Sequence, residues 1–488
     1  MATGTMKQWV LHGKRGIDSL ILEETPIPQP GENEVLVKLH AVSLNYRDLM
    51  IANVSTTYLA PTFERLDVLT YNAKGVYYWK QSDSVVPVSD GAGQVISIGA
   101  KVKRFTPGQR VMPTFFQGYI SGNLTEEHMN SALGALPDGV LREYAVFNED
   151  SLVRIPPSLS YEEASTLPCA GLTAWNCLYG SRSLRPGDTV LTQGTGGVST
   201  FALQFAIAAG AETIATTGSA EKELRLKQLG VQHVINYRED PEWGTTAKLL
   251  SLDQKGANYV VEIGGPGTLH QSSRAAAVGG EVAIVGMLSV TNGNGKEIAP
   301  WNPHAAAHST RRIAVGSRLQ FDEMNRAIEV NKIRPVIDQV FDFKEAAEAF
   351  RYVWDGKHSG KVVIKIAEDG EIDKTNTYIM LRPRALTLVT VREELVDLVT
   401  RCALSLDVDD REPFLSVWTI SDPNSVDATV AGVTTKGVDK LCRTYFNLVG
   451  PMDTHQSIAS IRVDIHDGGK TAQITCTTLA SISVLVML

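Results

Sequence analysis

The chain has 488 residues, of which 43% are hydrophobic and 20% are charged, and its formal net charge at pH 7 is −8. This length exceeds what a single hydrophobic core organises, so two to four domains are expected. A net negative charge gives no positive electrostatic potential to attract nucleic acid or an anionic membrane surface, which argues against both as partners.

Cysteine spacing and hydropathy give a second set of exclusions. The five cysteines include no C-x-x-C pair, so neither a disulfide framework nor a zinc ribbon is predicted. The N-terminal segment lacks the apolar core of a signal peptide, and no apolar run reaches about 18 residues. We therefore expect a soluble, cytoplasmic protein that does not cross a membrane.

The first part of the chain reads as short strands joined by turns. Residues 34–42 alternate as a half-buried strand should, after a turn signal at residues 28–31. Residues 88–95 and 105–111 continue the same pattern of strands and turns. Together they predict a small β-barrel.

A glycine motif follows a buried strand near the middle of the chain. Residues 189–192 form a short apolar, β-branched run, and residues 194–197 (GTGG) break it before helical spacing begins at residues 201–208. Gly210 is placed to end that helix. Glycines allow a sharp turn and close approach to a pyrophosphate, while the helix N-terminus attracts the anion. Ser199 stands where the G-x-G-x-x-G pattern has its third glycine, and dinucleotide binding is predicted.

The segments around this motif alternate between strand and helix patterns. Residues 160–163 (SYEE) form a capping box that opens a helix, and residues 221–229 form another helix that Gly230 stops. Parallel strands of an α/β sheet are predicted at residues 213–217, 231–237, 258–263 and 282–285.

The composition changes after residue 366. Residues 367–385 are a linker, followed by amphipathic helices at 391–406, 411–418 and 437–449 and alternating strands at 458–465 and 472–478. The apolar tail 481–488 is predicted to be an unprotected strand edge.

Six segments, HAVSLNYRDL, VPVSDGAG, RFTPGQRV, LPCAGLTAW, QGTGGVS and SGKVVI, occur in that order. They resemble the medium-chain dehydrogenase/reductase superfamily, in its zinc-type alcohol-dehydrogenase-like and quinone-oxidoreductase-like branches. The resemblance implies an α/β protein with a GroES-like β-barrel catalytic domain, built from residues 1–158 and the return segment 318–366. It also implies a Rossmann domain with a doubly wound parallel sheet at residues 159–317, an active site between the two, and a homodimer.

Two regions depart from that pattern. Residues 54–74 interrupt the barrel, either as a retained intron or as a genuine surface insertion beside the cleft. Residues 386–488 contain REELVDLVTRCALSLDVDDREPFLSVW and GPMDTHQSI, which resemble a SnoaL-like, nuclear-transport-factor-two-like domain. That fold is an α+β cone, here incomplete, and it is either a working domain or a fused neighbouring gene.

The resemblance also bears on metal binding. Zinc members of the family have a Cys ligand where this chain has Asn45 and a His ligand where it has Ser89, and only the third ligand position, Cys169, is retained. One thiolate cannot hold a catalytic zinc, which needs three protein ligands. No metal is therefore expected, and Cys169 is read as a small buried hydrophobe.

Without a metal, hydride transfer requires a substrate that accepts it readily, such as a quinone, an enone or an enoyl thioester. The catalytic candidates are Asn45, placed near the nicotinamide by the resemblance, and Tyr46, a hydrogen-bond or proton donor. The alternative for Tyr46 is a half-buried barrel tyrosine. Asp48 is expected to pair with Arg47 or a nearby backbone group.

The coenzyme is predicted from the end of the second strand of the α/β sheet. No carboxylate precedes the next helix there, whereas Ser219 and Lys222 suit a 2′-phosphate. The resemblance adds Tyr237 to this pocket, and NADPH is therefore preferred over NADH. The other coenzyme contacts carried over by position are Asn45, Thr173, Gly194, Thr195, Gly196, Gly197, Val198, Thr217, Gly264, Gly265, Gly286, Met287, Ser317, Arg318 and Lys361.

These predictions describe a zinc-independent oxidoreductase that transfers a hydride between NADPH and a small-molecule quinone, enone or other activated carbonyl. Two alternatives remain open. One is an alcohol dehydrogenase or aldehyde reductase of the zinc-type family. The other is a non-catalytic NADPH-binding protein or a SnoaL-like ligand-binding protein.

Overall fold

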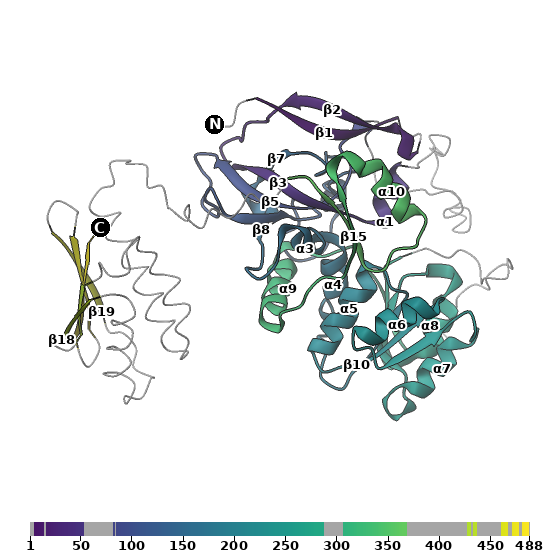
Figure 1. Ribbon diagram of the computed structural model, residues 1–488. Coiled ribbons are helices and arrows are strands. Elements are labelled where there is room, and N and C mark those ends of the chain that lie inside the picture. The colour runs from purple at the N-terminus through teal and green to yellow at the C-terminus, as the bar shows by residue number, and fades with distance from the viewer. Residues whose placement is uncertain are drawn as a thin grey trace. The chain divides into compact units, whose positions relative to one another are not determined.

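The computed structural model describes residues 4–13, 16–52, 82, 84–286 and 306–367, and the backbone of five strands between residues 427 and 487. Contacts divide the chain into two units, Met1–Gly370 and Glu371–Leu488 (Figure 1). The insertion 54–74, residues 368–385 of the linker, and the three helices predicted between residues 391 and 449 lie outside the described residues.

Two sheets, in which most neighbouring strands are antiparallel, form the barrel half. A three-stranded sheet has the order β2-β1-β4, and a larger one runs β15-β16-β3-β5-β6-β8, with β7 also paired to β3. The return segment thus adds β15 and β16 beside the N-terminal strands, as the resemblance predicts. The strands are β1 Thr5–His12, β2 Leu20–Pro26, β3 Glu34–Leu44, β4 Ser84–Val85, β5 Asp90–Ile98, β6 Arg110–Pro113, β7 Tyr144–Asn148, β8 Leu152–Arg154, β15 Ile337–Asp342 and β16 Lys361–Lys365.

β3 is more deeply buried than its sequence pattern predicts. The prediction of a half-buried strand is wrong, because every residue of β3 except Glu34 and Lys38 is buried. The strand pairs with β5, β7 and β16, and both of its faces are covered. On one face His40 stacks on the ring of Tyr161, with ring centroids 4.2 Å apart. The alternation in the sequence therefore does not correspond to alternating burial in this strand.

The second half is a six-stranded parallel sheet of order β11-β10-β9-β12-β13-β14. This order, with the chain moving outward first on one side and then on the other, is that of a dinucleotide-binding doubly wound sheet and confirms the Rossmann prediction. The predicted strands and helices are confirmed, although β13 begins earlier than expected. The elements are β9 Thr189–Gln193, α5 Gly197–Ala208, β10 Glu212–Thr217, α6 Ala220–Gln228, β11 His233–Asn236, α7 Trp243–Leu250, β12 Ala257–Glu262, α8 Leu269–Ala275, β13 Ala276–Ile284 and β14 Ser309–Arg312.

Alternate residues of β10 show how helices cover both faces of this sheet. On one face Ala215 packs with Leu203 of α5 and Leu226 of α6. On the other face Ile214 packs with Trp243 of α7. β10 is buried on both faces although its sequence, ETIATT, contains only two apolar residues, so threonine side chains also lie in the interior.

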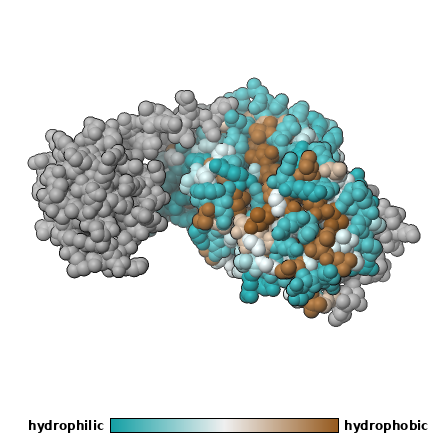
Figure 2. Space-filling view, turned by 60° about the horizontal axis from the view of Figure 1, so that its bottom comes forward, coloured by the Kyte–Doolittle hydropathy of each residue, from teal (hydrophilic) through white to brown (hydrophobic). Residues whose placement is uncertain are grey.

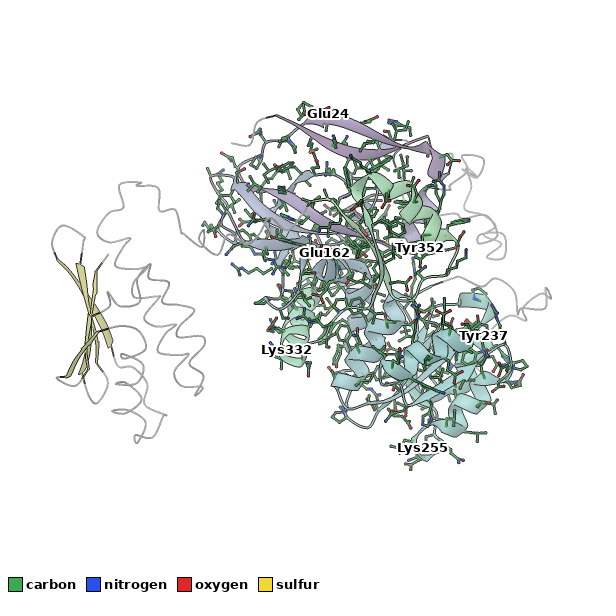
Figure 3. All side chains as sticks on the ribbon, in the orientation of Figure 1. Glu24, Glu162, Tyr237, Lys255, Lys332 and Tyr352 are labelled. Carbon is green, nitrogen blue, oxygen red and sulfur yellow. The ribbon has the colours of Figure 1, made fainter. Side chains whose placement is uncertain are left out.

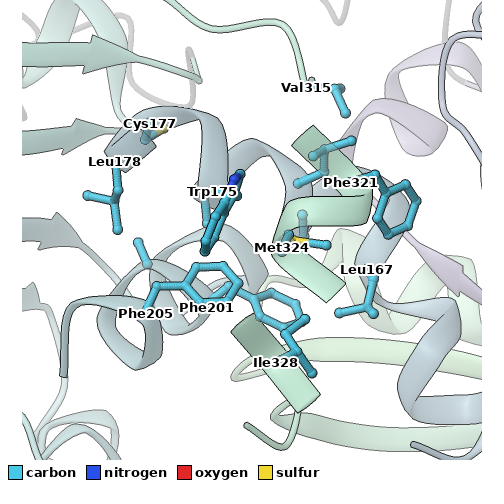
Figure 4. Packing of buried hydrophobic residues seen from close by; sticks show 14 of the residues in the cluster. Leu167, Trp175, Cys177, Leu178, Phe201, Phe205, Val315, Phe321, Met324 and Ile328 are labelled. Atoms are coloured by element: carbon cyan, nitrogen blue, oxygen red, sulfur yellow. The ribbon is translucent and has the colours of Figure 1, made fainter. Parts of the chain in front are cut away.

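A shared core joins the two halves. Rings of α5 pack against α4 and α9, so that helices from three parts of the chain meet in one cluster (Figure 4). The helices outside the parallel sheet are α1 Tyr46–Ala52, α2 Glu126–Asn130, α3 Tyr161–Ser165, a π-helix Leu167–Gly171, α4 Leu172–Tyr179, α9 Arg318–Asn331 and α10 Ala346–Trp354. The predicted capping box at Ser160 is present at the start of α3.

The C-terminal unit contains an antiparallel sheet of order β18-β17-β21-β20-β19. The strands predicted at 458–465 and 472–478 are confirmed. The prediction of an unprotected tail edge is wrong, because the last strand pairs with β17 on one side and β20 on the other. The strands are β17 Asp427–Val430, β18 Val433–Lys436, β19 Ser460–His466, β20 Thr471–Thr477 and β21 Ser481–Met487.

Within the described residues, no helix has the length and apolar character needed to cross a bilayer. On the face of the molecule shown in Figure 2, hydrophobic residues gather toward the middle and hydrophilic residues surround them.

Candidate active site

The glycine turn between β9 and α5 has the geometry that its sequence predicts. Gly194 has a φ of +70°, and its amide donates to the Thr216 carbonyl of the neighbouring strand at 2.7 Å. The hydroxyl of Ser199 donates to the Gln193 carbonyl at 2.7 Å. A serine is therefore accepted where the motif has its third glycine, because its hydroxyl bonds back to the end of β9.

The loop fits a phosphate group. α5 has no side-chain cap and no acidic residue in its first turn, so its first amides are not satisfied by a side chain. A Cβ placed on Gly194 or Gly196 would meet no atom within 4 Å. The loop thus borders open space with a helix N-terminus turned to it, which suits a pyrophosphate.

The return segment lies directly on this loop. The amide of Gly360 donates to the Thr195 carbonyl at 2.7 Å, and Gly360 forms a parallel bridge with Gly196. A Cβ on Gly197 would lie 2.5 Å from the Cδ atom of Lys361. Glycine is needed at 197 for this approach, which brings the barrel half against the phosphate loop.

Lys361 connects the loop with the barrel. Its stem contacts Gly197, while its ammonium donates to the Leu44 carbonyl at 2.6 Å and to Asn45 Oδ1 at 2.6 Å. The ammonium also lies 3.9 Å from Asp90 Oδ2, and only 3% of Lys361 is exposed. Lys361 therefore places a buried positive charge beside Asn45.

Asp90 is the buried anion of this cluster. It accepts hydrogen bonds from the Ser89 hydroxyl at 2.6 Å and from the Cys169 amide at 3.1 Å. Burial raises the pKa of Asp90, and the Lys361 ammonium and the Asn45 amide oppose the rise. Asn45 Nδ2 itself has no hydrogen bond of ordinary geometry to any residue that the structure describes.

The expected pairing of Asp48 is confirmed. Its carboxylate accepts from Arg47 at 3.0 Å and from the Asn45 amide at 2.8 Å. Burial raises the pKa of Asp48 to about 6 despite the opposing Arg47 charge. The pair fixes the start of α1 and the backbone of Asn45.

Tyr46, the other catalytic candidate, is 49% exposed at the first position of α1. Its neighbours in sequence, Asn45 and Arg47, belong to the buried cluster. Its side chain is therefore accessible to a small molecule.

The three positions compared with zinc ligands lie around one cluster, since Asn45 contacts Lys361 while Ser89 and Cys169 contact Asp90. In the part of the chain that the structure describes, no group of three His, Cys, Asp or Glu side chains could hold a metal ion. Burial, followed by the charge of Asp90, raises the pKa of the Cys169 thiol well above its ordinary value. This donor set does not fit a catalytic zinc, which requires deprotonated thiolate or imidazole ligands.

The carboxyl end of β10 is the place where the sequence predicts the 2′-phosphate of the coenzyme. Ser219 is the N-cap of α6 and accepts from the Lys222 amide at 3.3 Å. The Lys222 ammonium donates to the carbonyls of Gly356 at 3.3 Å and His358 at 3.1 Å, and burial lowers its pKa. Thr217 is 1% exposed, and its hydroxyl has no partner among the described residues.

Two side chains that follow β11, those of Tyr237 and Arg238, lie close to Gly218. A Cβ on Gly218 would lie 2.6 Å from the Tyr237 hydroxyl and 3.0 Å from Arg238 Nε. Tyr237 stands on the rim of this half of the molecule (Figure 3). Sequence reasoning missed Arg238, although its charge directly after Tyr237 was a visible signal.

The other predicted coenzyme contacts differ in their burial and in the groups they contact. Thr173 is buried in α4, and Val198 packs against the shared core. Ser317 caps α9, while Arg318 pairs with Asp150 at 2.6 Å on the barrel side.

The second glycine turn follows the adjacent strand, β12. Gly264 and Gly265 lie directly after β12, and Gly265 has a φ of +81°. Gly286 follows β13, and its amide donates to the Glu262 carbonyl at 3.2 Å. Met287 lies outside the described residues.

Comparison with known protein families supports this geometry. Residues 31–157 match the model of the alcohol dehydrogenase GroES-like domain, and residues 229–364 match that of zinc-binding dehydrogenases. These ranges cover most of the barrel half and the strands β11 to β14 of the parallel sheet, while the glycine loop lies between them.

Individual proteins match over most of their lengths. A zinc-type alcohol dehydrogenase-like protein of Schizosaccharomyces pombe is 42% identical over 367 residues, covering 74% of this chain and 99% of the relative. The chloroplastic quinone-oxidoreductase QR1 of Triphysaria versicolor is 29% identical, covering 70% of this chain and 92% of its own. A solved structure of the 2-octenoyl-CoA carboxylase reductase CinF with NADP and 2-octenoyl-CoA is 27% identical, with a TM-score of 0.61 over 75% of this chain and 88% of that chain.

Proposed function

The chain belongs to the medium-chain dehydrogenase/reductase superfamily, and from this premise we propose that it is a zinc-independent reductase. Its reaction is the transfer of a hydride between NADPH and a quinone, an enone, an enoyl thioester or another activated carbonyl compound. The oxidoreductase class follows from the family; the coenzyme, the substrate class and the absence of metal are the proposal.

One observation carries the proposal. Where zinc relatives need three ligands, this chain places the amide of Asn45, the hydroxyl of Ser89 and a thiol whose pKa is raised. The Lys361 ammonium donates to Asn45 and lies 3.9 Å from Asp90, which accepts from the Ser89 hydroxyl. A fixed cation among these side chains disfavours a second, divalent one by charge repulsion. Chemistry that needs no Lewis acid is then favoured, and quinones and enones accept hydride without one.

The preference for NADPH rests on the end of β10. No carboxylate there accepts the ribose hydroxyls, because Glu221 pairs with Arg225 at 3.0 Å. Tyr237 and Arg238 lie close to Gly218, and Ser219 caps α6, whose first turn contains Lys222. Positive or hydroxyl groups at this place favour a 2′-phosphate. The NADP that CinF binds is consistent with this preference.

The chain's own residues would act as follows. Bound NADPH supplies the hydride, while the glycine loop holds its pyrophosphate at the N-terminus of α5. Asn45, held by Lys361 and Asp48, orients the nicotinamide or the substrate oxygen. Tyr46, exposed at the rim, donates a hydrogen bond or a proton to the oxygen on which negative charge develops.

A substrate panel tests this assignment. Purified protein is assayed with NADPH and NADH against quinones, enones and enoyl thioesters, and in reverse with primary and secondary alcohols, each with and without a strong chelator. The proposal requires chelator-resistant reduction of the first group. Chelator-sensitive alcohol oxidation, or one tightly held zinc per chain by elemental analysis, would instead establish the alternative, an alcohol dehydrogenase or aldehyde reductase. NADPH binding with no turnover on any substrate would favour a non-catalytic binding protein.

Two further parts of the proposal concern assembly. We propose a homodimer, supported by β14, which has a paired neighbour on one side only among the described residues. Light scattering of the purified protein decides this. We also propose that residues 386–488 form a SnoaL-like domain, supported by the five-stranded antiparallel sheet.

A further inference from the structure

In the parallel sheet, β10 and β11 follow β9 outward on one side, and β12, β13 and β14 follow outward on the other side. The strand order therefore changes direction between β9 and β12, which are neighbours in space. Ligands of such sheets bind outside the carboxyl ends of the strands at this point. Gln193 is the last residue of β9 and Glu262 is the last residue of β12. Their side chains meet at the floor of the place where the coenzyme is expected.

The Gln193 side chain is both a donor and an acceptor of hydrogen bonds to β12 and the turn that follows it. Its Nε2 donates to Glu262 Oε2 at 2.7 Å. Its Oε1 accepts the amides of Ile263 at 3.0 Å and Gly264 at 2.9 Å. The residue just before the first glycine turn therefore satisfies two amides of the second glycine turn.

Glu262 completes the arrangement from the other side. Its Oε1 accepts the Gly265 amide at 2.8 Å and the Thr268 hydroxyl at 2.5 Å, and its Oε2 also accepts the Ser272 hydroxyl. Glu262 is 0% exposed, and burial raises its pKa while these donors oppose the rise.

A buried carboxyl group is costly, and two apolar side chains would fill the same floor at lower cost. What an apolar pair could not do is hold the amides of Ile263 and Gly264 against Gln193 at the end of β9 while Glu262 holds the next amide, that of Gly265. The arrangement is therefore better explained by the position it imposes on the two turns than by stability.

We propose that Gln193 and Glu262 are positioning residues, forming a clasp that fixes the turn 264–265 relative to the turn 194–197 so that one coenzyme contacts both. The clasp acts through the backbone of the turns, and neither side chain is assigned a contact with the coenzyme. The inference rests on the proposed function, because it takes NADPH to lie on these turns.

A reciprocal exchange tests the clasp. Gln193→Glu places two carboxyl groups against each other, and Glu262→Gln leaves an amide NH2 group facing Gln193 Nε2; each change breaks the complementarity. The double variant restores it with the roles reversed, because Gln at 262 can donate to Glu at 193. We expect each single variant to raise the NADPH dissociation constant at least about tenfold, because loss of residues that hold metal ligands in place weakens metal binding by a similar factor. The double variant should return to within about threefold of the wild type, and kcat at saturating NADPH should change least.

A matched control lies at the opposite end of the same sheet. Glu212 accepts the Thr189 hydroxyl at 2.7 Å and the Leu252 amide at 2.8 Å, at the amino ends of the strands. Glu212→Gln should lower the melting temperature without changing NADPH affinity. If the clasp variants behave as this control does, with lower melting temperatures and unchanged affinity, the clasp is only structural and the inference is overturned.

A milder variant covers the case in which a single exchange does not fold. Ser272→Ala removes one donor to Glu262 without adding charge, and a measurable rise in the NADPH dissociation constant is expected. Unchanged affinity in that folded variant would overturn the inference. A wild-type protein that binds neither coenzyme would overturn the proposed function together with the clasp, whereas wild-type binding with unaffected variants overturns the clasp alone.

Discussion

The two halves of the N-terminal unit handle buried polar groups in different ways. Around the glycine loop, polar groups bond to the ends of β9 and its neighbour β10, as the Ser199 hydroxyl does to the Gln193 carbonyl and the Gly194 amide to the Thr216 carbonyl. In the barrel, Asn45, Asp90, Cys169 and Lys361 come from four distant parts of the chain to make one cluster. The glycine loop is thus stabilised within one sheet, while the cluster around Asn45 depends on the assembly of four separate segments of the chain.

The largest expected effect comes from removing the cation that joins the halves. Lys361→Met leaves the buried carboxyl group of Asp90 without its cation and Asn45 without its donor, so kcat/KM should fall by about a hundredfold. Loss of one partner from a buried pair should also lower the free energy of unfolding by about 3–5 kcal/mol. Steady-state kinetics and chemical unfolding measure both. Lys357→Met, which removes an exposed lysine from the preceding loop, is the control and should change neither.

A smaller effect separates the coenzymes. Lys222→Ala should raise the NADPH dissociation constant about tenfold and leave that for NADH within about twofold, since only NADPH carries the 2′-phosphate. Lys227→Ala on the same helix, where Lys227 pairs with Glu223 at 2.7 Å, is the matched control. Equal losses for the two coenzymes would remove the argument for a 2′-phosphate site at α6.

The barrel cluster also predicts a pH dependence. The pKa of Asp48 is raised to about 6 in the folded protein, from an ordinary 3.8. A raised carboxyl pKa means that the folded state binds the proton more tightly, so this group's contribution to stability falls as pH rises between those values. Asp48→Asn cannot titrate there. Its stability relative to the wild type should therefore improve by about 2 kcal/mol from pH 4.5 to pH 7, measured by denaturant unfolding at both values. A difference that stays constant across this range would show that Asp48 has an ordinary pKa.

The smallest effect is expected at the C-terminal unit. Every residue assigned to the coenzyme site or the barrel cluster precedes residue 367, so a chain ending at Gly370 should retain kcat/KM within about twofold. A loss greater than tenfold would show that residues 371–488 contribute to the reaction.

The strand–turn–helix around Gly194 and the parallel βα segments could be predicted from sequence, because each depends on spacing within a few residues. The Asp48 pairing was also predictable, since its partners Arg47 and Asn45 are adjacent. The burial of β3, the internal position of β21 and the Gln193–Glu262 pair were not. Each depends on which distant segment packs against the residue, and no local pattern records that.

The amino-acid sequence by itself determined the family, the glycine loop and the succession of strands and helices along the chain, because backbone conformation and hydrophobic periodicity are local properties. Only the tertiary structure placed the Lys361 ammonium beside Asn45 and Asp90, and joined the two glycine turns through Gln193 and Glu262. The physical reason is that the energy of a buried charge or hydrogen bond depends on its partner, and the partner can be distant in sequence. Lys361 and Asn45 are more than three hundred residues apart, and Gln193 and Glu262 lie on two neighbouring strands.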